Sequence, residues 1–290
     1  MDNTQIILDK YLIYKDKIIG KGSYSKIYLG TIIKTNIKIV SKCINISKIS
    51  KEFVLHEISI MKPLDHIHIV KLIDYCFIED EAHIILEYCE NGDLTNIIDK
   101  INKESEIKSI FKQIVKGIKY LKKNNIIHRD LKPHNILITK ENIVKISDFG
   151  FANDECTQNL YKTICGSPYY MAPEMLQYHN YSNNVDLWSL GVILYQLCYK
   201  NVPFNSSNVQ ELIFKLSNNK IIIKNSYSND CTNLIKQLLV LNPKKRITWE
   251  SFFNHVWLNN KENKNIFKDI VINHNYLLKK SAKITIPYKK

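Results

Sequence analysis

The stretch Ile126–Leu137, IIHRDLKPHNIL, decides how the rest of this sequence is interpreted. Apolar residues open and close it, so both ends are expected to be fixed to a hydrophobic core. Between them, one short loop gathers Asp130, Lys132 and Asn135, a set that is costly to bury without partners. The carboxylate can accept a proton from a hydroxyl, the ammonium can hold a phosphate, and the amide oxygen can bind a metal ion. A polar surface turn is the alternative interpretation.

The composition is that of an ordinary globular protein. The chain has 290 residues, of which 45% are hydrophobic and 24% charged, and its length suggests about two domains. No apolar run is long enough to cross a bilayer, and the amino terminus lacks the pattern of a signal peptide. We therefore expect a cytoplasmic protein without a transmembrane segment, with a nuclear location as the alternative.

The seven cysteines and the net charge of +13 say less about function. No two cysteines have C-x-x-C spacing and their number is odd, so the sequence predicts neither a disulfide framework nor a zinc site. A strongly basic chain can bind nucleic acid or an anionic membrane. Here the lysines are scattered, and a composition rich in Ile, Lys and Asn explains them. A basic nucleic-acid-binding protein remains an alternative.

Hydrophobic periodicity divides the chain into two unlike parts. Residues 1–13 are expected to be a lead-in and 259–290 a basic tail. Residues 14–88 alternate as strands around one helix at 51–62, whereas residues 92–258 follow helical spacing. The helices are expected at 104–123, 185–199, 209–216 and 229–239, and the second of these is apolar on nearly all sides. The sequence thus predicts an α+β protein with a cleft between its two parts, where ligands commonly bind.

Three motifs carry a family resemblance. HRDLKPHN at 128–135, Asp148-Phe149-Gly150 and Ala172-Pro173-Glu174 resemble the catalytic loop, the D-F-G motif and the A-P-E motif of protein kinases. The resemblance runs from about Tyr14 to about Leu258. It implies a kinase domain at 14–258 with a small antiparallel-sheet N-lobe (about 14–88) carrying one main helix and a larger helical C-lobe (about 92–258). The motifs look closest to the autophagy-initiating kinases and to the calmodulin-dependent and energy-sensing group.

The resemblance implies a serine/threonine kinase that uses ATP and Mg²⁺ to phosphorylate protein substrates. Asp130 would be the catalytic base, Lys132 would contact the γ-phosphate, and Asn135 and Asp148 would bind Mg²⁺. Lys42 and Glu57 would form the ion pair that positions ATP. The residues expected to bind the nucleotide are Gly20, Lys21, Gly22, Ser23, Ile27, Val40, Lys42, Glu57, Glu87, Cys89 and Leu137.

Two departures from the family pattern affect the nucleotide end. Ser25 stands in place of the third glycine of G-x-G-x-x-G, and Val40 replaces the small alanine of V-A-I-K. Ser25 restricts the conformations of the glycine loop, and the bulkier Val40 narrows the adenine pocket. A weakly active pseudokinase that acts as a scaffold is therefore an alternative.

Further expectations concern regulation and substrates. The resemblance makes Thr163 a candidate phosphorylation site, modified by an activating kinase or by the chain itself and pairing with Arg129; an unmodified loop residue is the alternative. His134 and Gln196 replace acidic residues that select arginine in peptide substrates, which predicts little arginine preference. Phe151, directly after D-F-G, is large and apolar, which in the family that the chain resembles goes with serine over threonine. The basic tail could make weak contact with an anionic surface.

Overall fold

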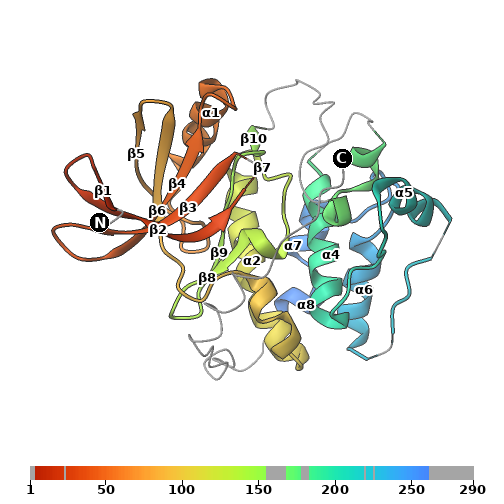
Figure 1. The fold of residues 1–290 in the computed structure, drawn as a ribbon. Coiled ribbons are helices and arrows are strands. Elements are labelled where there is room, and N and C mark those ends of the chain that lie inside the picture. Colours follow the sequence, from red (N-terminus) through yellow and green to blue (C-terminus); the bar gives the residue numbers. More distant parts are fainter. Residues whose placement is uncertain are drawn as a thin grey trace.

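The computed structural model describes residues 4–22, 24–154, 168–177, 183–218, 220–224 and 226–260. A β-sheet lobe stands beside a helical lobe (Figure 1). The sheet has six strands in the order β1-β2-β3-β4-β6-β5, and all neighbours pair antiparallel. The strands are β1 (Thr4–Ile7), β2 (Tyr11–Lys21), β3 (Ser25–Ile32), β4 (Lys38–Asn45), β5 (Leu72–Ile78) and β6 (Glu81–Glu87).

The segment expected to be a lead-in contributes to this sheet. β1 pairs with the start of β2, from Thr4 opposite Tyr14 to Ile7 opposite Tyr11. Ile7 and Ile13 are fully buried, and they pack with Ile39 and other apolar side chains on one face of the sheet. The reason is that residues 4–13 carry enough apolar side chains to cover this face, which would otherwise be exposed to water.

Helix α1 (Lys51–Met61) covers the opposite face of the sheet. Val54 and Ile58 on α1 pack against Ile44 and Ile84 of the sheet. Ser50 begins the helix, because its side chain accepts a hydrogen bond of 3.3 Å from the backbone N–H of Phe53. This packing fixes the position of α1, and with it that of Glu57, whose carboxylate contacts Lys42.

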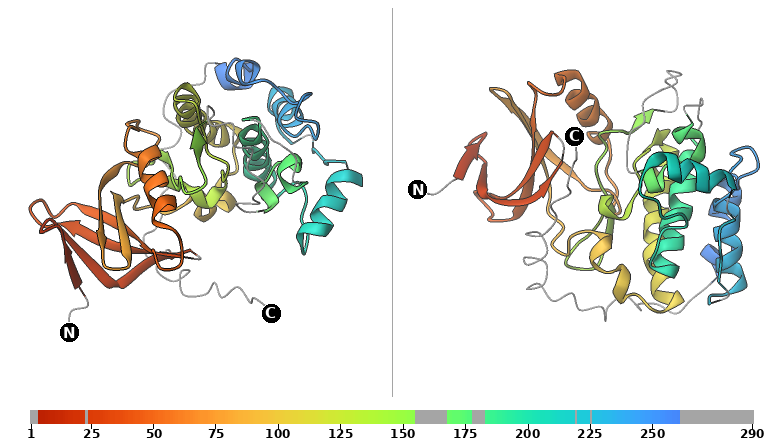
Figure 2. Two further views of the ribbon diagram at one scale, coloured as in Figure 1. Left: turned by 90° about the horizontal axis from the view of Figure 1, so that it is seen from above. Right: turned by 45° about the vertical axis from the view of Figure 1, so that its right-hand side comes forward.

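The helical lobe is built around α4, which lies between α2 and α6 (Figure 2). Almost every side chain of α4 is buried, as its unbroken apolar sequence predicts. The helices are α2 (Glu104–Lys123), α3 (Pro173–Leu176), α4 (Val185–Tyr199), α5 (Val209–Asn218), α6 (Asn229–Leu238), α7 (Trp249–Phe253) and α8 (Val256–Asn259). Short 3-10 turns are at Leu94–Asn96, Ile98–Lys100, Pro133–Asn135 and Pro168–Tyr170.

Two short antiparallel strand pairs hold the two ends of the stretch Ile126–Leu137. β7 (Ile126–Ile127) pairs with β10 (Asn153–Asp154), and β8 (Ile136–Ile138) pairs with β9 (Val144–Ile146). The loop between β7 and β8 is therefore fixed at both ends, as predicted. The two-lobed α+β architecture expected from the sequence is confirmed. Within the described ranges, no helix is both long and apolar enough to span a bilayer.

Candidate active site

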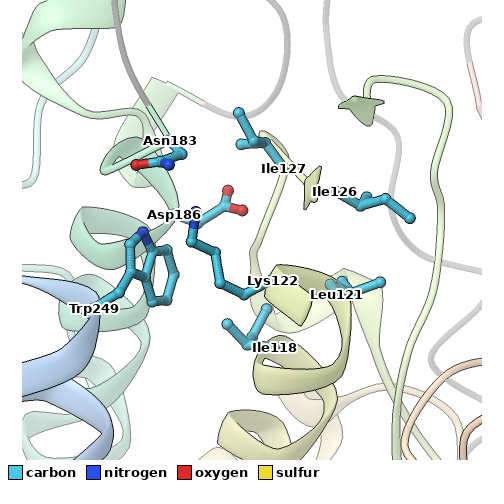
Figure 3. Close-up of a pocket in the computed structure, with 8 residues that line it drawn as sticks. All are labelled: Ile118, Leu121, Lys122, Ile126, Ile127, Asn183, Asp186 and Trp249. Atoms are coloured by element: carbon cyan, nitrogen blue, oxygen red, sulfur yellow. The ribbon is translucent and has the colours of Figure 1, made fainter. Parts of the chain in front are cut away.

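Asp186 at the start of α4 anchors the loop between β7 and β8. Its carboxylate accepts hydrogen bonds from the backbone N–H groups of His128 (2.8 Å) and Arg129 (2.9 Å). Figure 3 shows the Asp186 carboxylate directed toward Ile127. Burial raises the pKa of Asp186, while the bonds from the loop favour its charged form. Arg129 has a φ of 66°, an uncommon conformation for a residue with a side chain, and these bonds help to hold it.

Asp130, Lys132 and Asn135 meet within this loop. The Lys132 ammonium lies 2.7 Å from Asp130 Oδ2. The Asn135 amide nitrogen donates to the Asp130 carbonyl (2.8 Å) and to Asp130 Oδ2 (3.0 Å). Because the amide nitrogen is turned toward Asp130, Asn135 Oδ1 is the atom that can bind a metal ion. The structure thus brings together all three residues that the sequence predicted to be catalytic.

Lys42 connects the two lobes at the other side of the site. Its ammonium on β4 lies 2.6 Å from Glu57 Oε1 on α1 and 2.9 Å from Asp148 Oδ1, which directly follows β9 and Ser147. Burial lowers the pKa of Lys42, but the two carboxylates outweigh it and hold the pKa above its usual value. Lys42 in turn lowers the pKa of Asp148 to about 2, against the opposing effect of burial. The raised pKa of Lys42 and the lowered pKa of Asp148 both favour an ion pair between these side chains at neutral pH.

The segment around Asp148 is fixed to the loop by contacts that the sequence did not predict. His128 Nε2 lies 3.0 Å from the Ser147 carbonyl, and the Ser147 N–H donates to the Asn135 carbonyl at 2.9 Å. Phe149 is fully buried, with its ring centroid 5.2 Å from that of His128. His56 Nε2 on α1 lies 3.2 Å from the Ala152 carbonyl. These contacts join residues from different segments, and neither the hydrophobic pattern nor the motifs indicated them.

The side chains at this site suit a magnesium ion. Mg²⁺ prefers oxygen ligands, usually one or two carboxylates together with phosphate and water. Asp148 supplies a carboxylate whose side chain is 40% exposed, and its lowered pKa keeps it ionised. Asn135 supplies an amide oxygen. The hydrogen bonds from the Asn135 amide nitrogen to Asp130 fix the orientation of this oxygen. The donor set therefore fits the predicted metal.

The glycine loop closes with a tight turn. Gly22 N–H donates to the Ser25 carbonyl at 2.8 Å, and a Cβ added at Gly22 would lie 2.7 Å from Ser25 Oγ. The hydroxyl of Ser25 thus uses the space that Gly22 leaves open. Gly20 and Lys21 end β2, while Ser23 lies outside the described residues.

The remaining residues that were predicted to bind the nucleotide lie on β3, β4, β6 and β8 and on the link between the lobes. Ile27 on β3 is the cross-strand partner of Lys42, Val40 is buried on β4, and Leu137 lies on β8. Burial raises the pKa of Cys89 to about 12, so this thiol packs in the link as a neutral group.

Glu87, at the end of β6, has a partner that sequence reasoning missed. Its carboxylate lies 2.9 Å from the ammonium of Lys145 on β9, and it accepts a 2.6 Å hydrogen bond from the Lys71 N–H. The side chain of Glu87 is thus used within the protein. Its backbone is the part that we expect to face a nucleotide.

A buried ion pair joins the A-P-E segment to the end of the helical lobe. Arg246 Nη1 and Nη2 donate to Glu174 Oε1 (2.8 Å) and Oε2 (3.0 Å). Arg246 Nη1 also donates to the Asn184 carbonyl at 2.8 Å. The pair thereby positions the start of α4, which carries Asp186.

The protein kinase domain family matches residues 13–258 of the chain. The chain belongs to the protein kinase family. It is 43% identical to "Serine/threonine-protein kinase atg1" of Dictyostelium discoideum, over 84% of this chain and 39% of that protein. It is 36% identical to "Serine/threonine-protein kinase ATG1c" of Arabidopsis thaliana, over 89% of this chain and 37% of that protein.

A third relative belongs to another kinase group. "SNF1-related protein kinase catalytic subunit alpha KIN12" of Arabidopsis thaliana is 35% identical, over 88% of this chain and 52% of its own length. The protein kinase family is confirmed, and these relatives support the resemblance to the autophagy-initiating and energy-sensing kinases. The kinase chain spans about half or less of each of these relatives.

Proposed function

We propose that this chain transfers the γ-phosphate of ATP to serine or threonine hydroxyls of protein substrates. One observation carries the proposal: a single ammonium, that of Lys42, contacts Glu57 in the sheet lobe and Asp148 in the helical lobe. In kinases the lysine–glutamate pair and the aspartate of D-F-G must both be in place for transfer. Both are in place here, beside a complete catalytic loop. The names of the relatives support serine or threonine as the acceptor.

The position of each side chain supports the role that we propose for it. The Asp130 carboxylate would orient the substrate hydroxyl and accept its proton. Lys132, held beside it at 2.7 Å, would stabilise negative charge on the transferred phosphoryl group. Asp148 and Asn135 would hold Mg²⁺, which supplies charge neutralisation between the phosphates when bound. Phosphoryl transfer needs positioning and charge stabilisation above all, and these residues supply both.

We further propose that this kinase prefers peptides without upstream arginine. His134 and Gln196 provide no carboxylate, and the Gln196 side chain accepts a 2.7 Å hydrogen bond from Tyr170. Asp93 is acidic, but it caps a turn by accepting from the Thr95 N–H at 2.9 Å. Phe151 is 38% exposed and packs edge-on against Phe53, so a large apolar side chain follows D-F-G, in keeping with a serine preference. A peptide array that shows strong arginine or threonine selection would contradict these proposals.

The test compares Asp130→Asn and Asp148→Asn with the wild type. Asp130→Asn should lower transfer to a peptide by at least about 100-fold, because loss of a catalytic base typically has that effect. It should bind Mg·ATP almost normally, whereas Asp148→Asn should also weaken nucleotide binding. Asp99→Asn, at an exposed position of the helical lobe, is the matched control and should be fully active. A fully active Asp130→Asn would refute the proposal, and wild type that binds Mg·ATP without transfer would indicate a pseudokinase.

Three further predictions have not been tested. Thr163 and the basic tail from 261 onward lie outside the described residues, so phosphorylation at Thr163 and contact of the tail with an anionic surface stay predictions. The cytoplasmic location also stays a prediction. Phosphatase treatment of wild type and Thr163→Ala would test the first.

A further inference from the structure

A cysteine, a glutamate and a histidine converge on the face of the sheet opposite Lys42. Cys43 lies on β4 as the cross-strand partner of His83 on β6, and Glu81 precedes His83 by two residues on the same strand. Side chains alternate along a strand, so Cys43 lies on the face of β4 opposite that of its neighbour Lys42. One ligand atom from each of the three residues lies within 4.8 Å of the others.

His83 is the unusual member of this cluster. Its side chain is fully buried, and its Nδ1 lies 3.0 Å from Ser41 Oγ. Its Nε2 is also buried and makes no hydrogen bond with any described residue, although Glu81 Oε2 lies 3.4 Å away. A buried ring nitrogen without a hydrogen bond costs free energy and requires an explanation.

We propose that Cys43, Glu81 and His83 bind a zinc ion. Thiolate, imidazole and carboxylate together are ligands that zinc accepts, whereas Mg²⁺ and Ca²⁺ prefer oxygen alone. Ligand atoms around tetrahedral zinc are about 3.5 Å apart, given bonds of about 2.0–2.3 Å. The 3.4 Å between Glu81 Oε2 and His83 Nε2 already matches this spacing. The Cys43 thiol would release its proton to solvent on binding, and water would complete the four ligands.

Ser41 would orient the histidine. A metal-bound histidine usually uses its second ring nitrogen in a hydrogen bond that fixes the ring and its tautomer. Ser41 Oγ beside His83 Nδ1 meets this requirement, with His83 Nε2 left to face the ion. Ser41 is fully buried, so the orientation is held by the packing of the sheet.

Lys15 on β2 competes with the ion. Its ammonium lies 3.2 Å from Glu81 Oε2, the same oxygen that faces His83, and it also lies over the ring of Tyr28. The Glu81 side chain is 42% exposed, so this edge of the cluster is open to solvent. Zinc would therefore enter from the side of Glu81 and displace Lys15, whose positive charge opposes binding.

In the test, the reduced full chain is titrated with Zn²⁺ in competition with a chromophoric chelator. A parallel titration uses Co²⁺. We expect a site with a near-ultraviolet thiolate-to-cobalt absorption band. Cys43→Ser should abolish this band, and both Cys43→Ser and Glu81→Gln should weaken zinc binding by at least about tenfold. Removing a supporting side chain alone typically costs 10–100-fold, so Ser41→Ala should also weaken binding. Lys15→Met should tighten it.

Two controls separate this site from other zinc binding. Cys76→Ser removes a thiol on β5 that is also a cross-strand partner of His83, and it should leave the band and the affinity unchanged. Asp148→Asn removes the predicted magnesium ligand and should also leave the cobalt band and the zinc affinity unchanged. Unchanged zinc affinity in Cys43→Ser and Glu81→Gln, an equal loss in Cys76→Ser, or no tightening in Lys15→Met would overturn the proposal. If Cys43→Ser does not fold, Glu81→Gln, altered at a partly exposed carboxylate, decides the outcome.

Discussion

Replacing Glu174 by glutamine should destabilise the helical lobe more than any change to a surface ion pair. The side chain of Glu174 is 7% exposed and that of Arg246 is fully buried, and two hydrogen bonds of 2.8 and 3.0 Å join them. Glutamine keeps the size of the side chain but leaves the guanidinium buried without its counter-charge. Breaking a buried pair in this way costs about 3–5 kcal/mol of unfolding free energy. The carbonyls of Asn184 and Val240, which also accept from Arg246, place the cost toward the lower end.

The assay is urea denaturation followed by tryptophan fluorescence, which reports on Trp188 beneath the guanidinium of Arg246. Arg246→Met and the double variant with Glu174→Gln complete a cycle, and the double variant should cost clearly less than the sum of the two single changes. Asp65→Asn is the control, because its ion pair with Lys71 is exposed and 3.9 Å long and should contribute at most about 1 kcal/mol. A loss below about 1 kcal/mol for Glu174→Gln, or additive costs, would refute this reasoning.

Other substitutions test different parts of the structure. Lys42→Met should reduce Mg·ATP-dependent transfer by about 100-fold or more, because a fixed positive charge at the phosphates is lost; steady-state kinetics measure this, and unchanged kcat/KM would contradict it. Lys42 lowers the pKa of Asp148 from 3.8 to about 2, so the ionised carboxylate stabilises the fold above about pH 4 and this stabilisation disappears as the pH falls toward 2. Asp148→Asn should accordingly differ from wild type in stability at neutral pH and converge with it near pH 2; a constant difference would be inconsistent. Gly191→Ala should destabilise by about 1–3 kcal/mol in urea, because the added Cβ would lie 2.8 Å from Leu238 Cβ; a neutral effect would show that α4 and α6 separate easily.

The sequence by itself determined the longer helices and the local chemistry of the catalytic loop. α2 and α4 have the predicted bounds, because their hydrophobic patterns repeat over many residues and end at clear boundaries. Asp130, Lys132 and Asn135 lie within five residues of one another, so their association is set by one loop. Spacing along the chain was sufficient wherever the interacting groups belong to one segment.

Only the tertiary structure decided which distant groups meet. Lys42 and Asp148 are 106 residues apart, and their contact depends on how the two lobes are placed. Strand β1 packs on the apolar face of the sheet and removes that face from water. The alternation of residues within 4–13 did not by itself indicate this strand. Cys43 meets His83 through strand register, and no cysteine spacing could have indicated the zinc site that we propose. Register and lobe placement result from the packing of the whole core, so these contacts cannot be read from a linear pattern.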